Sequence, residues 1–110
     1  GNDTYIVDNT GDVIGDSSLI GGGTDLVRSS VSWSLTFLLE NLTLTGTGSI
    51  RGTGNNSANV ITGNSGANTL DGSAGNDTLI GGSGNDTLIG GTGADRIEAT
   101  SGADVVVLSS

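Results

Sequence analysis

A nine-residue repeat constrains this chain more than any other feature of its sequence. From Gly63 the chain reads as five consecutive nonapeptides, GNSGANTLD, GSAGNDTLI, GGSGNDTLI, GGTGADRIE and ATSGADVVV, which end at Val107. A weaker unit, GNNSANVIT, precedes them from Gly54 in the same register. The fourth position is Gly in five of these six units, the sixth is Asn or Asp, and the eighth is Ile, Leu or Val. A fixed period this short is typical of a solenoid.

Each repeat predicts a turn followed by a short strand. The first six residues are rich in Gly, Asn, Ser and Asp, which suit a turn that visits positive φ. The last three, such as Thr-Leu-Ile, form a minimal strand whose middle side chain points inward. Because each unit reverses the chain, two units make one coil, and strands one coil apart stack in parallel at about 4.8 Å. This places Asp77 over Asp95, Asp86 over Asp104, and Asn68 under Asp86.

The stacked turns favour a bound divalent cation. Two carboxylates one coil apart repel each other, and the one basic residue beside them in the sequence, Arg96, is at an outward position of its strand. A cation between the turns would convert that repulsion into coordination, with turn carbonyls as further oxygen ligands. An all-oxygen site of flexible geometry suits Ca²⁺, and the sequence has no His or Cys to bind a transition metal.

The units resemble the glycine-rich nonapeptides of the RTX (repeat-in-toxin) family, the hemolysin-type calcium-binding repeats, whose pattern is G-G-x-G-x-D-x-U-x with U a large aliphatic residue. Residues 81–89 and 90–98 match every fixed position, and residues 72–80 miss only the second Gly. The resemblance implies an all-β, right-handed parallel β-roll, a β-solenoid with calcium-binding turns. In that family each Ca²⁺ lies between turns two units apart. Its ligands are the position-six carboxylates, the carbonyls of positions two and four of one turn, and those of positions one and three of the next.

Carried onto this chain, the resemblance implies two complete sites, a weaker third site, and about two to four Ca²⁺ ions in all. The third site is weaker because Asn68 removes one charge. A metal-free solenoid held by ladders of Asn side chains is the alternative, and it suits residues 54–71 better than the later units. The first site uses Ser73, Gly75 and Asp77 with Gly90, Thr92 and Asp95; the second, on the opposite edge, Gly82, Gly84 and Asp86 with Ala99, Ser101 and Asp104; the third, Asn64, Gly66 and Asn68 with Gly81, Ser83 and Asp86.

We expect two regions. Residues 1–53 form a degenerate β-roll or capping region, with an apolar strand over residues 30–39, and residues 54–110 form the nonapeptide-repeat β-roll. Asp3, Asp12 and Asp25 could ligate calcium, although their turns are incomplete and exposed turn caps are the simpler interpretation. Alternating apolar side chains predict a half-buried strand over residues 30–39, which forms the main core or caps an open end of the roll. An aromatic ligand platform is the alternative for this strand. Its apolar residues are Val31, Trp33, Leu35, Phe37 and Leu39.

The charge and residue composition of the chain limit the classes of partner that it can bind. The net charge is −9, with three Arg and no Lys, so nucleic acid and anionic membranes are poor partners, and we expect no membrane insertion. One inward aliphatic side chain per nine residues does not offset the conformational entropy of so many glycines. The chain is therefore expected to be disordered without Ca²⁺ and folded with it. It also begins within a repeat, so a flanking domain of a longer protein is expected.

The resemblance implies a non-enzymatic calcium-binding module of a secreted bacterial protein. Such a module folds on Ca²⁺ outside the cell, aids type I secretion and stabilises an attached domain. One alternative is an extracellular or cell-surface structural element, an adhesive fibre or surface layer, with end-to-end self-association through open strand edges. Another is the C-terminal accessory module of a secreted protease, lipase or alginate epimerase. We expect no catalytic residue and no cofactor other than Ca²⁺ within this chain.

Overall fold

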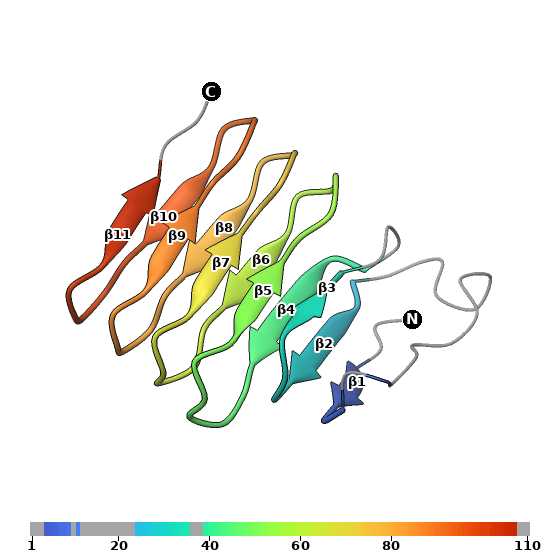
Figure 1. The fold of residues 1–110 in the computed structure, drawn as a ribbon. Coiled ribbons are helices and arrows are strands. Elements are labelled where there is room, and N and C mark those ends of the chain that lie inside the picture. Colours follow the sequence, from blue (N-terminus) through green and yellow to red (C-terminus); the bar gives the residue numbers. More distant parts are fainter. Residues whose placement is uncertain (1–3, 10, 12–23, 36–38, 108–110) are drawn as a thin grey trace.

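In the computed structural model the chain is a β-solenoid of short parallel strands (Figure 1). The structure describes residues 4–9, 11, 24–35 and 39–107. Within these ranges there is no helix, and hence none that could cross a membrane. The strands are β1 (Thr4–Val7), β2 (Leu26–Ser29), β3 (Trp33–Ser34), β4 (Asn41–Leu44), β5 (Arg51–Thr53), β6 (Val60–Thr62), β7 (Thr69–Asp71), β8 (Thr78–Ile80), β9 (Thr87–Ile89), β10 (Arg96–Glu98) and β11 (Val105–Val107).

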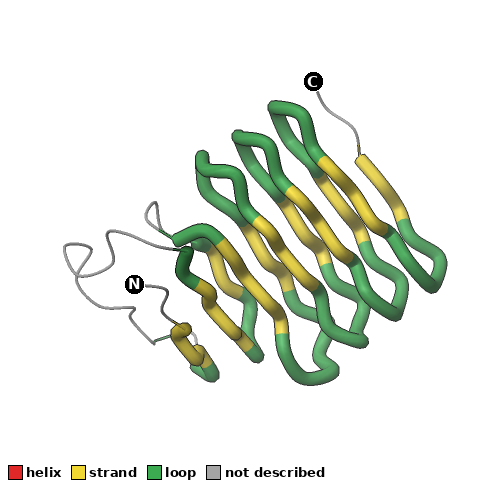
Figure 2. The backbone as a smooth tube through the Cα atoms, turned by 180° about the vertical axis from the view of Figure 1, so that it is seen from behind, coloured by secondary structure: helices red, strands yellow, loops and turns green. Residues whose placement is uncertain are grey.

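The strands form two sheets, and from β3 onward successive strands alternate between them. One sheet has the order β1-β2-β4-β6-β8-β10 and the other β11-β9-β7-β5-β3, and the pairing is parallel throughout. Turns join the two sheets at both edges, so the chain winds as a flattened coil (Figure 2). Within the nonapeptides each strand pairs with the strand two units away, as Thr78 does with Val60 and Arg96. The prediction of an all-β parallel roll is confirmed.

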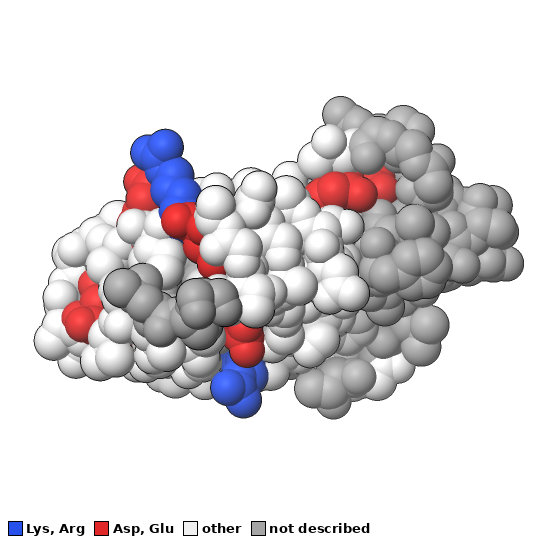
Figure 3. Space-filling model, turned by 90° about the horizontal axis from the view of Figure 1, so that it is seen from above, with Lys and Arg blue, Asp and Glu red and all other residues white. Residues whose placement is uncertain are grey.

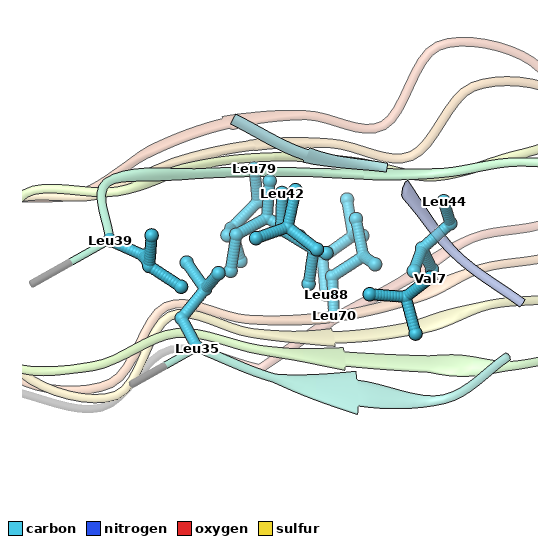
Figure 4. Close-up of a cluster of buried hydrophobic side chains, with 10 residues drawn as sticks. Val7, Leu35, Leu39, Leu42, Leu44, Leu70, Leu79 and Leu88 are labelled. Carbon is cyan, nitrogen blue, oxygen red and sulfur yellow. The ribbon is translucent and has the colours of Figure 1, made fainter. Parts of the chain in front are cut away.

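The core lies between the two sheets and receives one side chain from each nonapeptide strand up to β10. The middle residues Ile61, Leu70, Leu79 and Leu88 are fully buried. This follows from the strand period, because only the middle of three residues points inward. The remaining buried apolar side chains come from the N-terminal coils: Val7, Val27, Leu35, Leu39, Leu42 and Leu44. In Figure 4, Leu35 and Leu39 lie on one side of the repeat leucines, and Val7 and Leu44 lie on the other.

The core thins toward the C-terminal end. Ile97 in β10 is only partly buried, and Val106 in β11 is 42% exposed. The N-terminal coils of the solenoid therefore bury more apolar side chain than the C-terminal coils.

The apolar segment before the repeats forms a shorter strand than the alternation predicts. Among the residues of this segment that the structure describes, only Trp33–Ser34 form a strand. The Ser29 side chain bends the chain just before it: Ser29 Oγ donates to the Val31 carbonyl at 2.6 Å and accepts from the Val31 N–H at 3.2 Å. Leu35 and Leu39 are nevertheless buried in the core, and Trp33 packs against it. Phe37 lies outside the described residues.

Candidate metal centre

Acidic and amide side chains stack in a column at each edge of the solenoid, as the repeat predicts. On one edge the main-chain N–H of Asn59 donates to Asp77 Oδ1 at 2.8 Å, and the N–H of Asp77 donates to Asp95 Oδ1 at 2.9 Å. Each carboxylate therefore bonds to the preceding coil with one of its two oxygens. The opposite edge repeats the bond, from Asn68 to Asp86 at 2.8 Å and from Asp86 to Asp104 at 2.7 Å.

The second oxygens of Asp77 and Asp86 have no hydrogen-bond partner. Both side chains are 1% exposed, and Oδ2 of each is buried without a donor. Burying a charged oxygen without a partner is costly, so such atoms in a native fold call for an explanation, commonly an ion or a water. The same atom lacks a donor in two separate turns. This arrangement therefore belongs to the repeat and does not arise from one local environment.

A small space beside Gly72 brings an orphaned oxygen close to the next coil. A Cβ at Gly72 would lie 2.6 Å from Asp77 Oδ2 and 2.8 Å from the carbonyl oxygen of Gly90. A Cβ at Gly81, on the other edge, would lie 2.8 Å from Asp86 Oδ2 and 3.2 Å from the carbonyl oxygen of Ala99. In both places the position-one glycine leaves room where a carboxylate oxygen and a carbonyl oxygen of two coils converge.

The carbonyls of positions two and four face the following coil. The Ser73 carbonyl oxygen lies against the Cα side of Gly91, and the Gly75 carbonyl oxygen against that of Gly93. Ser73 (φ 65°) and Gly75 (φ 96°) both have positive φ, as the turn prediction requires. The second edge has the same kind of contact. The Asn64 and Gly66 carbonyls lie against Gly82 and Gly84, and the Gly84 carbonyl lies against Gly102. The Gly82 carbonyl accepts a hydrogen bond from the Thr100 hydroxyl at 2.5 Å.

The electrostatics of these turns penalise the metal-free, ionised state. Burial raises the pKa of the Asp77 carboxyl to about 6; the Asn59 N–H opposes this shift, and the charges of Asp95 and Asp71 add to it. The pKa of Asp86 is raised for the same reason, against the Asn68 N–H and with the help of Asp104. On the face drawn in Figure 3, acidic atoms are few and scattered, which agrees with two of the turn carboxylates being buried.

The residues present fit a hard divalent cation. Each complete site offers two stacked carboxylates together with carbonyl oxygens, the ligand type that Ca²⁺ prefers. Across the described part of the chain no three His, Cys, Asp or Glu side chains come together, so a metal held here would depend on main-chain oxygens. The side chains of Ser83, Thr92 and Ser101 are exposed, which is compatible with these residues acting through their carbonyls.

Sequence reasoning missed the asparagines of position five, which the family pattern leaves unspecified. Asn76 Oδ1 accepts the N–H of Ala94 at 2.9 Å, and Asn85 Oδ1 accepts the N–H of Ala103 at 2.9 Å. Each bond joins the two turns of one complete site without using a ligand of that site. The sequence feature that could have indicated these bonds is an Asn at position five of two consecutive units, with an Ala at the same position one coil later.

Sequence reasoning also missed the upstream end of one column. The Asp25 N–H donates to Glu40 Oε1 at 2.7 Å, which is the same bond that links the position-six residues of the repeats. Asp25 is fully buried, so the expectation of an exposed turn cap is wrong for this residue. Asp3 and Asp12 lie outside the described residues. The sequence feature that could have indicated this bond is the acidic residue directly before β2 together with the acidic residue directly before β4.

A parallel β-solenoid with carboxylates and carbonyl oxygens stacked at its turns defines the class of calcium-binding β-rolls. The model of the RTX calcium-binding nonapeptide repeat matches residues 53–88 and 80–109, with four copies. These matches cover more than half of the chain, which therefore belongs to this family, whose repeats bind calcium. No curated protein and no solved structure matches the chain.

Proposed function

We propose that this chain is a non-enzymatic calcium-binding module of a secreted bacterial protein, and that calcium outside the cell completes its fold. The observation that carries this proposal is the pair of buried, partnerless Oδ2 atoms of Asp77 and Asp86. Each borders a carbonyl oxygen of the next coil, in a chain whose repeat family binds calcium.

The proposed ligands are those that the repeat pattern assigns. Asp77, Asp95 and the carbonyls around them form the first site, and Asp86 and Asp104 the second. A third, weaker site lies between turn 63–68 and Asp86. Bound Ca²⁺ supplies the positive charge that these turns lack, while the chain positions the oxygens through the 2.8 Å and 2.9 Å bonds to Asp77 and Asp95.

The proposed role is a calcium-driven folding switch. At low cytosolic Ca²⁺ the ionised turns repel one another, and an incompletely folded chain can pass a type I exporter. Outside the cell, at calcium levels that fill sites with Kd of about 10⁻⁴–10⁻³ M, binding stabilises the coil by mass action. The ordered module then stabilises an attached domain, which would hold any catalytic activity of the longer protein.

A calcium titration tests the proposal. We expect β-sheet circular dichroism and calorimetric heat to develop together between chelator and millimolar Ca²⁺, and Mg²⁺ to be a poor substitute. Asp86→Ala should weaken calcium binding at least tenfold, because Asp86 belongs to two sites. Glu98→Ala, which removes an acid from the face of a strand, is the matched control. Identical spectra with and without Ca²⁺, together with no binding heat, would overturn the proposal.

A second candidate function is an extracellular fibre formed by end-to-end stacking. It is favoured by the last strand, where Val105, Val106 and Val107 are 57%, 42% and 40% exposed along an open sheet edge. Light scattering in Ca²⁺ separates the two functions. A fibre would grow in mass as protein concentration rises, whereas an independent module would keep the mass of one chain.

A further inference from the structure

Two of the turns are built differently from the others. Turns 54–59 and 63–68 carry Asn at positions two and six, and none of their residues has positive φ. In the four turns that follow, from residue 72 onward, positions two and four all have positive φ and position six is Asp. The change in side chain therefore coincides with a change in backbone conformation.

On one edge the paired asparagines satisfy each other and bind the coil below. Asn59 Oδ1 accepts the N–H of Asn55 at 2.8 Å, while Asn59 Nδ2 donates to the Glu40 carbonyl at 2.8 Å and to Asn55 Oδ1 at 3.0 Å. Asn55 Nδ2 donates to the Leu39 carbonyl at 2.7 Å. Two neutral amides thus reach the carbonyls of the preceding coil.

On the opposite edge the second pair repeats this arrangement. Asn68 Oδ1 accepts the N–H of Asn64 at 2.7 Å, and Asn64 Nδ2 donates to the carbonyls of Thr45 and Gly48, both at 3.0 Å. Asn68 Nδ2 faces the Ile50 carbonyl at 3.3 Å. The repetition on both edges shows that the arrangement belongs to the Asn-x-x-x-Asn spacing and not to one local environment.

These amides supply what the acidic turns lack. An Asn side chain carries both donors and an acceptor, so it can bond to its own turn and to carbonyls of the coil below without any charge. An Asp in the same place offers only acceptors, and in turns 72–77 and 81–86 one of them is left buried without a partner. Turns 54–59 and 63–68 are therefore complete without a metal, whereas the later turns are not.

The amide turns also hold the first carboxylate of each complete site. The N–H of Asn59 donates to Asp77 Oδ1, and the N–H of Asn68 donates to Asp86 Oδ1, both at 2.8 Å. These bonds fix one oxygen of each carboxylate and leave Oδ2 toward the space beside the position-one glycine. Below the amide turns lies most of the apolar core; above them, each coil adds little.

We propose that the four asparagines of turns 54–59 and 63–68 form a metal-independent floor that positions Asp77 and Asp86 before calcium binds. Calcium-dependent order then starts at residue 72 and extends toward the C-terminal end, while coils up to residue 71 are ordered without the ion. In a stack whose coils contact only their neighbours, an ordered floor spares the next coil the unfavourable nucleation step. Asn59 and Asn68 are thus positioning residues for calcium sites to which they need not contribute a ligand. The inference rests on the proposed function for the sites above the floor, but it makes a separate statement about the metal-free chain.

Residue-resolved amide hydrogen exchange on the whole chain tests the inference. In chelator we expect protected amides in the strands up to β7 and rapid exchange in β8 to β11. Added Ca²⁺ should then protect β8 to β11. Equal, rapid exchange on both sides of residue 72 in chelator would overturn the floor, and so would equal protection on both sides.

The double variant Asn55→Ala, Asn59→Ala separates positioning from general stability, because neither residue belongs to a proposed calcium site. Each change removes an amide that donates to a carbonyl of the coil below. We expect it to abolish protection of turn 54–59 and β6 in chelator and to raise the calcium midpoint for ordering β8 to β11 about tenfold or more. Asn56→Ala removes an exposed amide of the same turn and should leave both readouts unchanged. Saturating Ca²⁺ should restore the fold of the double variant.

The outcomes distinguish this inference from the proposed function. If the strands up to β7 are protected in chelator but Ca²⁺ orders nothing beyond them, the floor stands and the calcium module fails. If Ca²⁺ orders β8 to β11 but the double variant behaves like Asn56→Ala, the calcium module stands and the floor is overturned.

Discussion

Asp77 is a carboxylate whose burial, without a metal, works against the fold. One oxygen accepts the N–H of Asn59 and the other has no partner, and the pKa is raised to about 6 from an ordinary value of 3.8. A folded-state pKa above the unfolded one means that the folded chain binds the proton more tightly. Its contribution to stability is therefore fully present below the ordinary value and is lost as pH rises through about 6. The raised pKa of Asp86 acts in the same direction.

Protons should therefore substitute partly for calcium. In metal-free buffer we expect the free energy of unfolding to increase as pH falls from 7 toward 4, whereas with Ca²⁺ the binding midpoint should move to higher concentration below about pH 6. Urea unfolding followed by circular dichroism at several pH values measures both trends. Asp77→Asn, which cannot titrate at that position, should reduce the slope. A metal-free stability that rises with pH over this interval would contradict the expectation.

Position six shows how one atom decides the character of a turn. Asn68 and Asp86 occupy equivalent places in stacked turns and differ by an amide nitrogen for an oxygen. The nitrogen lets Asn68 donate toward the coil below, and the oxygen leaves Asp86 with a buried acceptor that needs a cation. The repeat pattern predicted a weaker site at Asn68, with a metal-free ladder of Asn side chains as the alternative for residues 54–71, but it did not show which carbonyls the amide reaches.

At the scale of the element, the turn depends on the bare Cα of its first glycine. Gly72 does not have positive φ, so its role is spatial: an added methyl group would fill the space between Asp77 Oδ2 and the Gly90 carbonyl. The same holds for Gly81 beside Asp86. The first glycine of the repeat thus preserves room for the site, whereas the glycine of position four allows the turn its backbone conformation.

Gly72→Ala should separate these two roles. We expect the methyl group to weaken calcium binding at least tenfold and to destabilise the calcium-bound fold by about 1–3 kcal/mol through overpacking. Calorimetry and thermal unfolding in Ca²⁺ measure the two effects. Gly48→Ala is the control, because its methyl group would meet only Ile50 Cγ2, at 3.8 Å. Equal behaviour of the two variants would remove the space beside Gly72 from the site.

The strands within the repeats could be predicted from sequence, and those before them only in part. β6 to β11 each cover the last three positions of a unit, because turn residues and a single inward aliphatic residue recur at a fixed interval. Of the described residues in the expected strand 30–39, only Trp33–Ser34 form one. Alternation of apolar residues does not report a side chain that bonds the backbone near it, as Ser29 does. The Asp25–Glu40 bond was hidden for a related reason, since its two residues do not share the repeat spacing.

At the scale of the whole molecule, stability and charge are distributed unequally along the stack. The N-terminal coils hold most of the buried apolar side chains, and the C-terminal coils hold the stacked turn carboxylates of a chain with net charge −9. The sequence favoured one calcium-dependent unit, and it left a metal-free ladder of Asn side chains as the alternative for residues 54–71. The contacts of the amide turns divide that unit into a neutral floor and an acidic extension.

The strict pairing of each coil with its neighbours has a mechanical consequence. In the repeats, the bonds between position-six residues of adjacent coils join residues 18 apart in the chain, so the last coil can detach without disturbing those beneath it. A pull on the C-terminal end would meet the resistance of one coil at a time. The chain would then unzip in successive steps, each releasing about 60 Å of slack.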